Sequence, residues 1–433
     1  MDQELLALWG FSGMFILMAL RVPVGVAMGI TGVVGFAAVS GWMPAINLLV
    51  TVPLSVVTDY NLSVIPMFVL MGAFASQGGM STELYQAGRA WLGHHRGGLA
   101  LASVAACAGF SAINGSSVAT AATMTQVALP EMRRAGYDPG LSTGLIAAGG
   151  TLGIMIPPSV IFVLYGILTE IDITLLFAAG VIPGAMAVLF YSMLVSWMAH
   201  RRPDLLPRGE RHSWHERWQS LGNLWAVFFL FLFVLGGIYG GFFTVQEAAG
   251  VGAIGALLIG IARGQLRGPQ IRVALLQALR VSSAIMMIVV GAYLFGYFLS
   301  ITQFTQHAVE FLVALPIGAY GVLALIMIGY IALGAVMDEL AMLLLTVPIV
   351  VPALVELGFD PIWFGAVLVM AVTLGLISPP VGMNVFVINS IARDVPLVQI
   401  YKGTLPFIGV DLIRLVILCA FPALSLWLPG LLQ

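Results

Sequence analysis

Long apolar runs separated by short polar segments dominate this sequence. Uncharged runs of about 20 residues, such as 224–243, have the length that an α-helix needs to cross a bilayer. They are unlike the alternating segments of about 10 residues that form a transmembrane β-barrel. The pattern predicts an all-α polytopic membrane protein with helices at 5–20, 23–41, 61–78, 174–199, 221–243, 245–262, 281–299 and 404–428.

The remaining regions, 97–170 and 320–392, share an internal repeat. Residues 129–139 align with 351–361, and Thr151 to Pro158 align with Thr373 to Pro380, at a constant offset of 222 positions. The same offset places Ser116 on Asp338 without a gap. Chance is a poor explanation for similarity that extends over this length. We therefore expect two copies of one structural unit.

The placement of basic residues predicts how these copies cross the membrane. If Arg21 is cytoplasmic, the positive-inside rule places every later cluster of Lys and Arg on the same side. The basic clusters all fall on one side only if segment 97–135 enters and leaves the membrane on the cytoplasmic face. Segment 320–358 must then enter and leave it on the opposite face. Both segments are then re-entrant hairpins, and the repeats are inverted. Inverted repeats are typical of secondary transporters, which bind their substrates where the repeats meet near mid-membrane.

This topology divides the chain into four segments. N-terminal scaffold helices occupy 1–60. The first repeat, 61–200, contains hairpin 97–135 and a broken helix over 139–170. A basic cytoplasmic loop and linking scaffold helices occupy 201–280. The second repeat, 281–428, contains hairpin 320–358 and a broken helix over 361–392.

Composition agrees with this assignment and narrows the function. The chain is 60% hydrophobic and only 8% charged, with a mean hydropathy of +1.05, whereas soluble domains have roughly 25% charged residues. Cys107 and Cys419 lie in apolar runs and are expected to be buried thiols. Phosphate-binding loops, metalloprotease motifs and nucleophile elbows do not occur in the sequence. We therefore expect no enzyme, no organic cofactor and no nucleic-acid partner.

Polar residues at membrane depth mark the candidate site. The first hairpin has a small polar tip around Asn114, and prolines 157 and 158 then remove two backbone donors from a helix. Irregular backbone at this depth is tolerated only inside protein or along a cavity. Exposed carbonyl and hydroxyl oxygens suit a hard cation, and helix N-termini suit a carboxylate. The alternative for the tip is close helix packing, and for the prolines a plain kink.

The second copy repeats this arrangement with different chemistry. Asp338 and Glu339 occupy its hairpin tip, where a charge costs roughly 3 kcal/mol on insertion scales. Asp338 either completes a cation site or accepts backbone hydrogen bonds that hold the hairpin. Asp411 and Arg414 lie three residues apart on the last long span, and we expect a structural ion pair there.

The sequence resembles the large membrane subunit of tripartite ATP-independent periplasmic (TRAP) transporters, DctM-like members of the ion transporter superfamily. The resemblance covers nearly the whole chain and rests on motifs that occur in the family's order: Asn114-Gly-Ser-Ser-Val-Ala-Thr, Gly136-Tyr-Asp-Pro, Ile156-Pro-Pro-Ser, Thr244-Val-Gln-Glu-Ala-Ala, Gly358-Phe-Asp-Pro-Ile-Trp-Phe-Gly and Ser378-Pro-Pro-Val-Gly. The family often has Thr-Pro-Thr-Glu-Ala-Ala at the fourth motif, which puts only the start of that helix in question.

The resemblance implies an elevator-type transporter, in which hairpins and broken helices move against a scaffold. It implies a bacterial or archaeal inner-membrane protein and sodium-coupled import of an organic acid such as a C4-dicarboxylate, sialic acid or keto acid. The implied partners are a separate small membrane subunit of about four helices and a periplasmic substrate-binding protein. A stand-alone sodium/dicarboxylate symporter of the same superfamily is the alternative. Carried over by position, the sodium and substrate sites comprise Asn114, Ser116, Ser117, Thr151, Gly153, Pro157, Asp338, Thr373, Gly375, Ser378 and Pro379.

Overall fold

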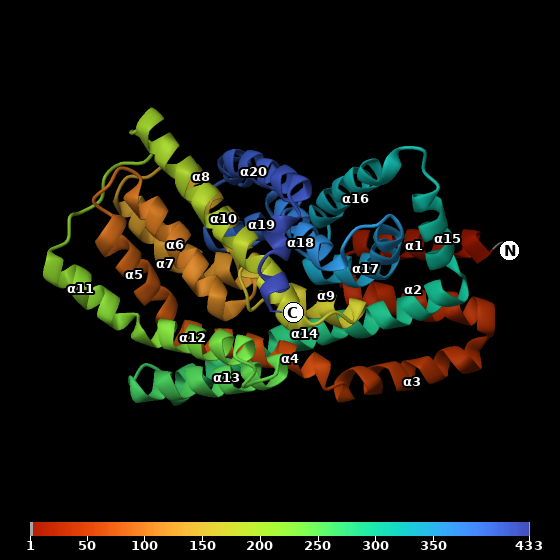
Figure 1. The fold of residues 1–433 in the computed structure, drawn as a ribbon. Helices are drawn as coiled ribbons and strands as arrows, with labels where there is room; N and C mark the ends of the chain where they lie inside the picture. The colour runs from red at the N-terminus through yellow and green to blue at the C-terminus, as the bar shows by residue number, and fades with distance from the viewer. Residues whose placement is uncertain (1–2, 433) are drawn as a thin grey trace.

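The computed structural model describes residues 3–432, so residues 1 and 2 of the predicted 1–60 segment lie outside it. Its elements are helices, as predicted (Figure 1). They are α1 (Gln3–Ala19), α2 (Val24–Ser40), α3 (Trp42–Thr58), η1 (Asn61–Ser63), α4 (Val64–Gln77), α5 (Met80–Leu92), α6 (Gly98–Asn114), α7 (Ser117–Arg134), α8 (Pro139–Met155), α9 (Val160–Thr169), α10 (Ile173–Arg201), α11 (Trp214–Asn223), α12 (Trp225–Tyr239), α13 (Val245–Ala262), α14 (Gly268–Ile301), α15 (Phe304–Val313), α16 (Gly318–Gly334), α17 (Glu339–Glu356), α18 (Pro361–Ile377), α19 (Met383–Ile391), α20 (Leu397–Ala420), α21 (Ala423–Leu426) and η2 (Pro429–Leu431).

These helices include long apolar segments suited to a bilayer. Among the described residues, 7 helices are long and apolar enough to cross a membrane, or 8 when the bent pair α3 and α4 counts as one span. The predicted polytopic all-α class is therefore confirmed.

The order of helices repeats along the chain. Helices α7 and α17 begin at Ser117 and Glu339, and α8 and α18 begin at Pro139 and Pro361, in both cases 222 positions apart. The flanking helices follow the same order within a few residues, including α1 with α12 and α10 with α20. The repeat found in the sequence therefore extends to the arrangement of elements. The opposite orientation of its two copies stays a prediction.

Several helix bounds differ from those expected. Helix α3 lies between 41 and 61, where the hydrophobic pattern predicted no separate span, because Pro53 is accommodated inside the helix. Helix α14 begins at Gly268 rather than 281, so much of the basic segment before it is helical. The last predicted span, 404–428, is divided into α20, which starts at Leu397, and the short α21. Thr244 caps α13 in a box with Glu247, so the departure from the family motif leaves that helix start intact.

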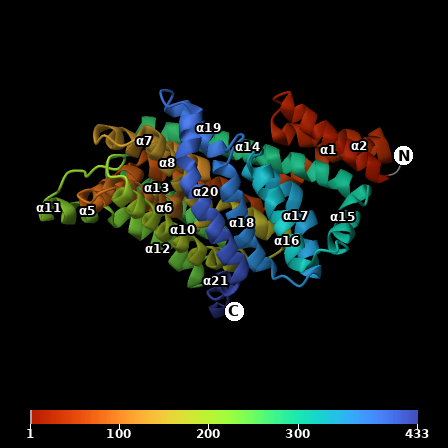
Figure 2. The ribbon, with the colours of Figure 1, turned by 90° about the horizontal axis from the view of Figure 1, so that it is seen from above.

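The two broken helices form the centre of the protein. From Gly140 to Met155 every residue of α8 is buried, and so is every residue of α18 from Trp363 to Ile377. Helices α10 and α20 pack around them, while α14 packs against α2, α3 and α4, and α13 packs against α4 and α12. Figures 1 and 2 show α11 beside α5 at one end of the molecule and α15 at the other. The helix breaks are thus held inside protein rather than in lipid.

Loops that the charge pattern assigned to one side are in contact with one another. Residues 93–97 are hydrogen-bonded to 206–209, and the Asp138 N–H donates to the Leu205 carbonyl. Arg133 forms an ion pair of 2.9 Å with Asp394, and Arg263 pairs with Glu83. On the other side, the acidic loops at 170–172 and the start of α13 share one pocket with Asn61. The structure therefore shows contacts within each set of loops, while the side of the membrane that each set faces stays a prediction.

Candidate functional site

The first hairpin tip, residues 114–117, joins α6 to α7 through a break in the helix. Gly115 has a φ of 64°, a left-handed conformation that glycine adopts without steric cost. Ser116 then caps α7, its Oγ accepting a hydrogen bond of 3.4 Å from the Ala119 N–H. The Asn114 side chain is buried and lies 3.5 Å from the Thr120 hydroxyl. The tip therefore presents backbone and side-chain oxygens at the start of a helix.

The first helix break, residues 156–159, lies directly against this tip. A Cβ on Gly153 would lie 2.5 Å from the Ser116 carbonyl oxygen, so only glycine permits the contact. Pro157 has no N–H to offer the Gly153 carbonyl. Pro158 likewise has no N–H for the Ile154 carbonyl. That carbonyl accepts a hydrogen bond of 2.7 Å from the Ser159 hydroxyl instead. Tip and break thus meet backbone to backbone.

The second tip, residues 335–338, and the second break, residues 378–382, meet in the same way. A Cβ on Gly375, the counterpart of Gly153, would lie 2.6 Å from the backbone of Gly334. The N–H groups of Val381 and Gly382 both donate to the Ala335 carbonyl, at 3.0 and 3.2 Å. Thr151 and Thr373 also match, because each hydroxyl donates over 2.6 Å to the carbonyl three residues before it. The predicted site residues are therefore brought together in two related groups.

Asp338 caps a helix, as its counterpart Ser116 does. Its Oδ1 accepts from the Leu340 N–H at 3.0 Å and from the Ala341 N–H at 3.5 Å. This establishes the capping alternative raised for Asp338, while cation contact stays a prediction.

The two groups differ in charge and exposure. Ser117 in the first group corresponds to Glu339 in the second, where Oε2 is buried without a hydrogen-bond partner. Pro157 and Pro158 are buried, whereas Pro379 and Pro380 are exposed. The half-sites are therefore chemically unequal.

Asn384 is a residue of this region that the sequence prediction left out of the site. Its amide nitrogen donates to the Ser117 hydroxyl at 2.7 Å and to the Ala147 carbonyl at 3.0 Å. The residue is fully buried, near the start of α19, and it connects α19 of the second copy to α7 and α8 of the first. Its position two residues after Gly382 was the available sequence signal.

A buried polar network supports the first group from behind. Arg414 and Asp411 form an ion pair of 2.5 Å, which confirms the predicted pairing. The other Asp411 oxygen accepts from the Tyr191 hydroxyl at 2.7 Å, and that hydroxyl lies 3.4 Å from Thr151 Oγ1. The network therefore fixes α10 and α20 to the broken helix.

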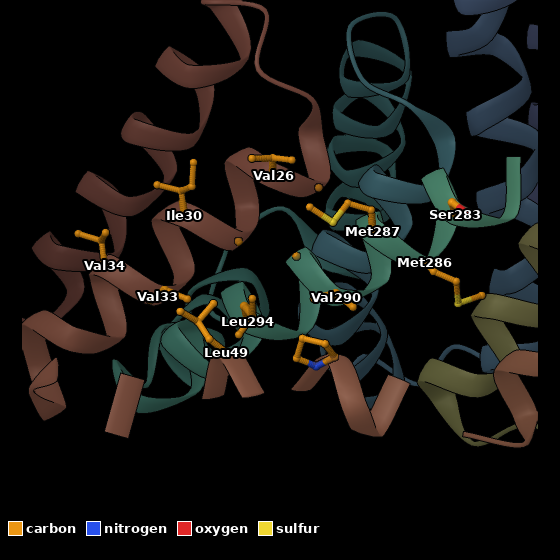
Figure 3. A pocket seen from close by; sticks show the side chains of 14 residues that line it. Val26, Ile30, Val33, Val34, Leu49, Ser283, Met286, Met287, Val290 and Leu294 are labelled. Carbon is orange, nitrogen blue, oxygen red and sulfur yellow. The ribbon is translucent and has the colours of Figure 1, made fainter. Parts of the chain in front are cut away.

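A separate cleft of about 690 Å³ between α2, α3 and α14 has a different character. Figure 3 shows Val26, Ile30 and Val33 facing Met287, Val290 and Leu294 across it. Ser283 is the one polar side chain in its lining. An ionised substrate would lose its hydration there without replacement, so this cleft is not the candidate site.

Comparison with known proteins places these features in context. The family model described as "Tripartite ATP-independent periplasmic transporter, DctM component" matches residues 11–424. A C4-dicarboxylate TRAP transporter large permease protein of Pseudomonas aeruginosa is 35% identical over 373 residues, 86% of each chain. An isethionate TRAP transporter permease protein, DctMQ, of Oleidesulfovibrio alaskensis is 30% identical over 98% of this chain, which spans 66% of that longer relative.

A solved structure supports the fold independently. The YdaH transporter of Alcanivorax borkumensis superimposes with a TM-score of 0.62 at 15% identity, covering 87% of this chain and 89% of that one. At this identity the likeness concerns the fold alone.

Proposed function

Because the chain belongs to the DctM component family of tripartite ATP-independent periplasmic transporters, we propose that it is the large permease subunit of a sodium-coupled importer of an organic acid. It is a multi-pass inner-membrane transport protein and not an enzyme, as the relatives are permeases. In this proposal the hairpins and broken helices carry the substrate in an elevator movement against the scaffold helices.

The observation that carries the proposal is the paired contact between tips and breaks. Gly153 lies against Ser116 at the first tip, and Gly375, its counterpart 222 residues later, lies against Gly334 at the end of α16. A structural kink needs no second copy and no hairpin tip opposite to it. Two such junctions near the repeat interface favour a binding site shared between the halves.

Sodium fits the donors that these junctions offer. Small hard cations prefer oxygen ligands, and at the first junction Ser116 and Ser117, two residues with hydroxyl groups, lie with their backbone against Gly153. The second adds the carboxylate of Asp338 and the hydroxyl of Ser378. Each sodium ion that enters contributes about 2.3 kcal/mol per 100 mV of membrane potential. Inward sodium movement would therefore drive accumulation of an anion.

Helix N-termini suit the anionic substrate. Helices α7, α9, α17 and α19 all begin at a junction, and the positive end of a helix dipole favours carboxylates. Such helix ends do not distinguish one organic acid from another. The substrates in the names of the two relatives, a C4-dicarboxylate and isethionate, agree with this tolerance. In our proposal a periplasmic binding protein selects the substrate.

A small membrane subunit completes the proposed assembly. The relative named DctMQ is longer than this chain, and the extra length would accommodate such a subunit in one polypeptide. Here we propose that it is a separate chain.

Uptake by proteoliposomes tests the proposal. Vesicles that contain this chain with its small subunit should accumulate a labelled acid only when sodium and the loaded binding protein are both outside. Uptake that persists when sodium is replaced by choline would refute sodium coupling. Uptake of free substrate without binding protein would instead favour the stand-alone symporter.

A further inference from the structure

Arg217 on α11 is a buried cation without an acidic partner. Its exposed fraction is 7%, and among the described residues no carboxylate lies within ion-pair distance of it. Its guanidinium packs 5.0 Å from the Trp214 ring centroid, and one terminal nitrogen lies 3.2 Å from His94 Nδ1. The Nε atom is buried and has no hydrogen-bond partner. A buried, unsatisfied guanidinium is costly, so a missing anion is the simplest complement.

The surroundings of Arg217 are also positive. Loss of hydration, together with the charges of His95, Arg217 and Arg211, lowers the pKa of His94. The neighbouring Glu216 is not within ion-pair distance of Arg217, because its carboxylate is held by the N–H and hydroxyl of Ser213 in a capping box and lies 3.5 Å from His212. The loop therefore keeps a net positive potential that favours an anion.

An apolar cleft of about 650 Å³ begins beside Arg217. Trp91, whose indole N–H donates to the Arg217 carbonyl at 3.1 Å, lines the cleft, as does Leu221 one turn after Arg217. The cleft continues between α6 and α12 to Phe231 and to Ile156 in the first break. From Leu221 on α11 to Phe231 on α12, the cleft runs along these helices for about 15 Å. Its shape and lining suit a hydrocarbon chain.

Tryptophans mark the level of the membrane surface at this end. The rings of Trp214 and Trp218 pack edge-on against Trp91, at centroid distances of 6.2 and 5.7 Å, and both are largely exposed. Tryptophan is enriched at the depth of lipid headgroups. The cationic cluster therefore lies where a phosphate would be, and the apolar cleft extends toward the bilayer centre.

We propose that this cleft binds an anionic phospholipid, with its phosphate on Arg217 and Arg211 and an acyl chain between α6 and α12. Basic pockets between helices on the cytoplasmic side bind anionic headgroups in this manner. The acyl chain would reach Ile156 in the first break, so occupancy would affect the helix that carries Thr151 and Gly153. The binding itself does not depend on the proposed transport function.

Lipid binding to the full-length protein purified from membranes tests the proposal. Phosphatidylglycerol should raise the melting temperature more than phosphatidylcholine with the same acyl chains, and inorganic phosphate alone should have no effect. Arg217→Gln should weaken phosphatidylglycerol binding about tenfold, as expected for loss of one charge-assisted hydrogen bond. Ala108→Leu, which fills the cleft from α6, should weaken binding of both lipids.

Matched variants separate a specific site from general attraction. Arg272→Gln removes a charge from an exposed position on α14 and should leave binding unchanged. Arg217→Lys keeps the charge and should retain most of the preference for phosphatidylglycerol, which guards against misfolding of the glutamine variant. Equal stabilisation by both lipids, or unchanged phosphatidylglycerol binding in Arg217→Gln, would overturn the proposal. An effect of inorganic phosphate equal to that of the lipid would also overturn it.

Discussion

At the scale of single residues, the candidate site depends on close backbone contact more than on unusual side chains. Gly153 and Gly375 allow a helix break to touch a hairpin tip, and Ser116 and Asp338 cap the helices that start there. The same two roles recur in both copies, although the capping residues differ in charge. In our proposal, function at this scale depends on the close backbone contact at each junction.

Gly153→Ala and Gly375→Ala should each reduce transport about tenfold or more. The added methyl would overlap backbone atoms, and relief by backbone movement costs about 1–3 kcal/mol. Sodium-dependent uptake and melting temperature are the measurements. Gly329→Ala in α16, where a Cβ meets nothing within 4 Å, is the matched control and should transport normally. Normal uptake in both glycine variants would mean that transport does not need close contact between the helix break and the hairpin tip.

Ser116→Ala and Asp338→Asn should impair transport while the protein still assembles in the membrane. Loss of the serine cap costs about 1 kcal/mol, whereas asparagine still caps a helix, so Asp338→Asn removes mainly charge. If Asp338 contacts sodium, its variant should raise the sodium concentration for half-maximal uptake. An unchanged sodium dependence would leave Asp338 with the capping role alone.

At the scale of elements, the two copies use the same order of helices with different continuity. Helices α3 and α4 are bent by 65° at Asp59 to Asn61, whereas the corresponding part of the second copy is the single helix α14. The proline breaks after α8 and α18 occur in both copies. The bend between α3 and α4 therefore occurs in the first copy only, whereas the proline breaks occur in both copies. This shared occurrence favours a role for the breaks in the proposed site.

Pro157→Ala should restore a backbone donor to the Gly153 carbonyl and allow α8 to continue. Because Pro157 lies after the end of α8, outside the helix, the variant should fold with a melting temperature close to that of the parent protein. Its sodium affinity should fall, because a carbonyl proposed to face the ion becomes hydrogen-bonded. Titration of uptake against sodium provides the measurement, with Pro130→Ala in α7, an exposed position, as the control. Unaltered sodium affinity would return this break to a structural role.

At the scale of the whole molecule, an elevator movement requires contacts that open and close. Glu83 on α5 pairs with Arg263, which follows α13, and Arg263 Nη1 donates to Glu83 Oε2 at 2.9 Å. Helix α5 packs mainly on the hairpin helix α6 and also on α11 and α7, whereas α13 packs on α4 and α12. The pair thus connects the two groups of helices that would move relative to one another.

Cross-linking Glu83→Cys to Arg263→Cys should stop transport if these groups move. The two native cysteines, both free, would first be replaced by alanine. A short thiol-reactive cross-linker should abolish uptake in the double variant and leave each single variant active. Full uptake after complete cross-linking would show that transport does not separate α5 from α13.

The sequence determined the features that follow from local chemistry. The length of the apolar runs predicted the membrane class, and the 222-residue offset predicted corresponding helices such as α8 and α18. Both properties depend only on residues that are close together in the sequence. The Asp411 and Arg414 pair followed from helical spacing alone. The motifs also identified the correct family.

Only the tertiary structure decided which distant residues meet. The contact of Asn384 with Ser117 joins positions 267 residues apart, and no local pattern specifies it. The unpaired guanidinium of Arg217 likewise became evident only once α11 was placed against α5. Such features depend on how helices pack against one another. That packing results from many contacts between distant residues at once, so no short stretch of sequence reveals it.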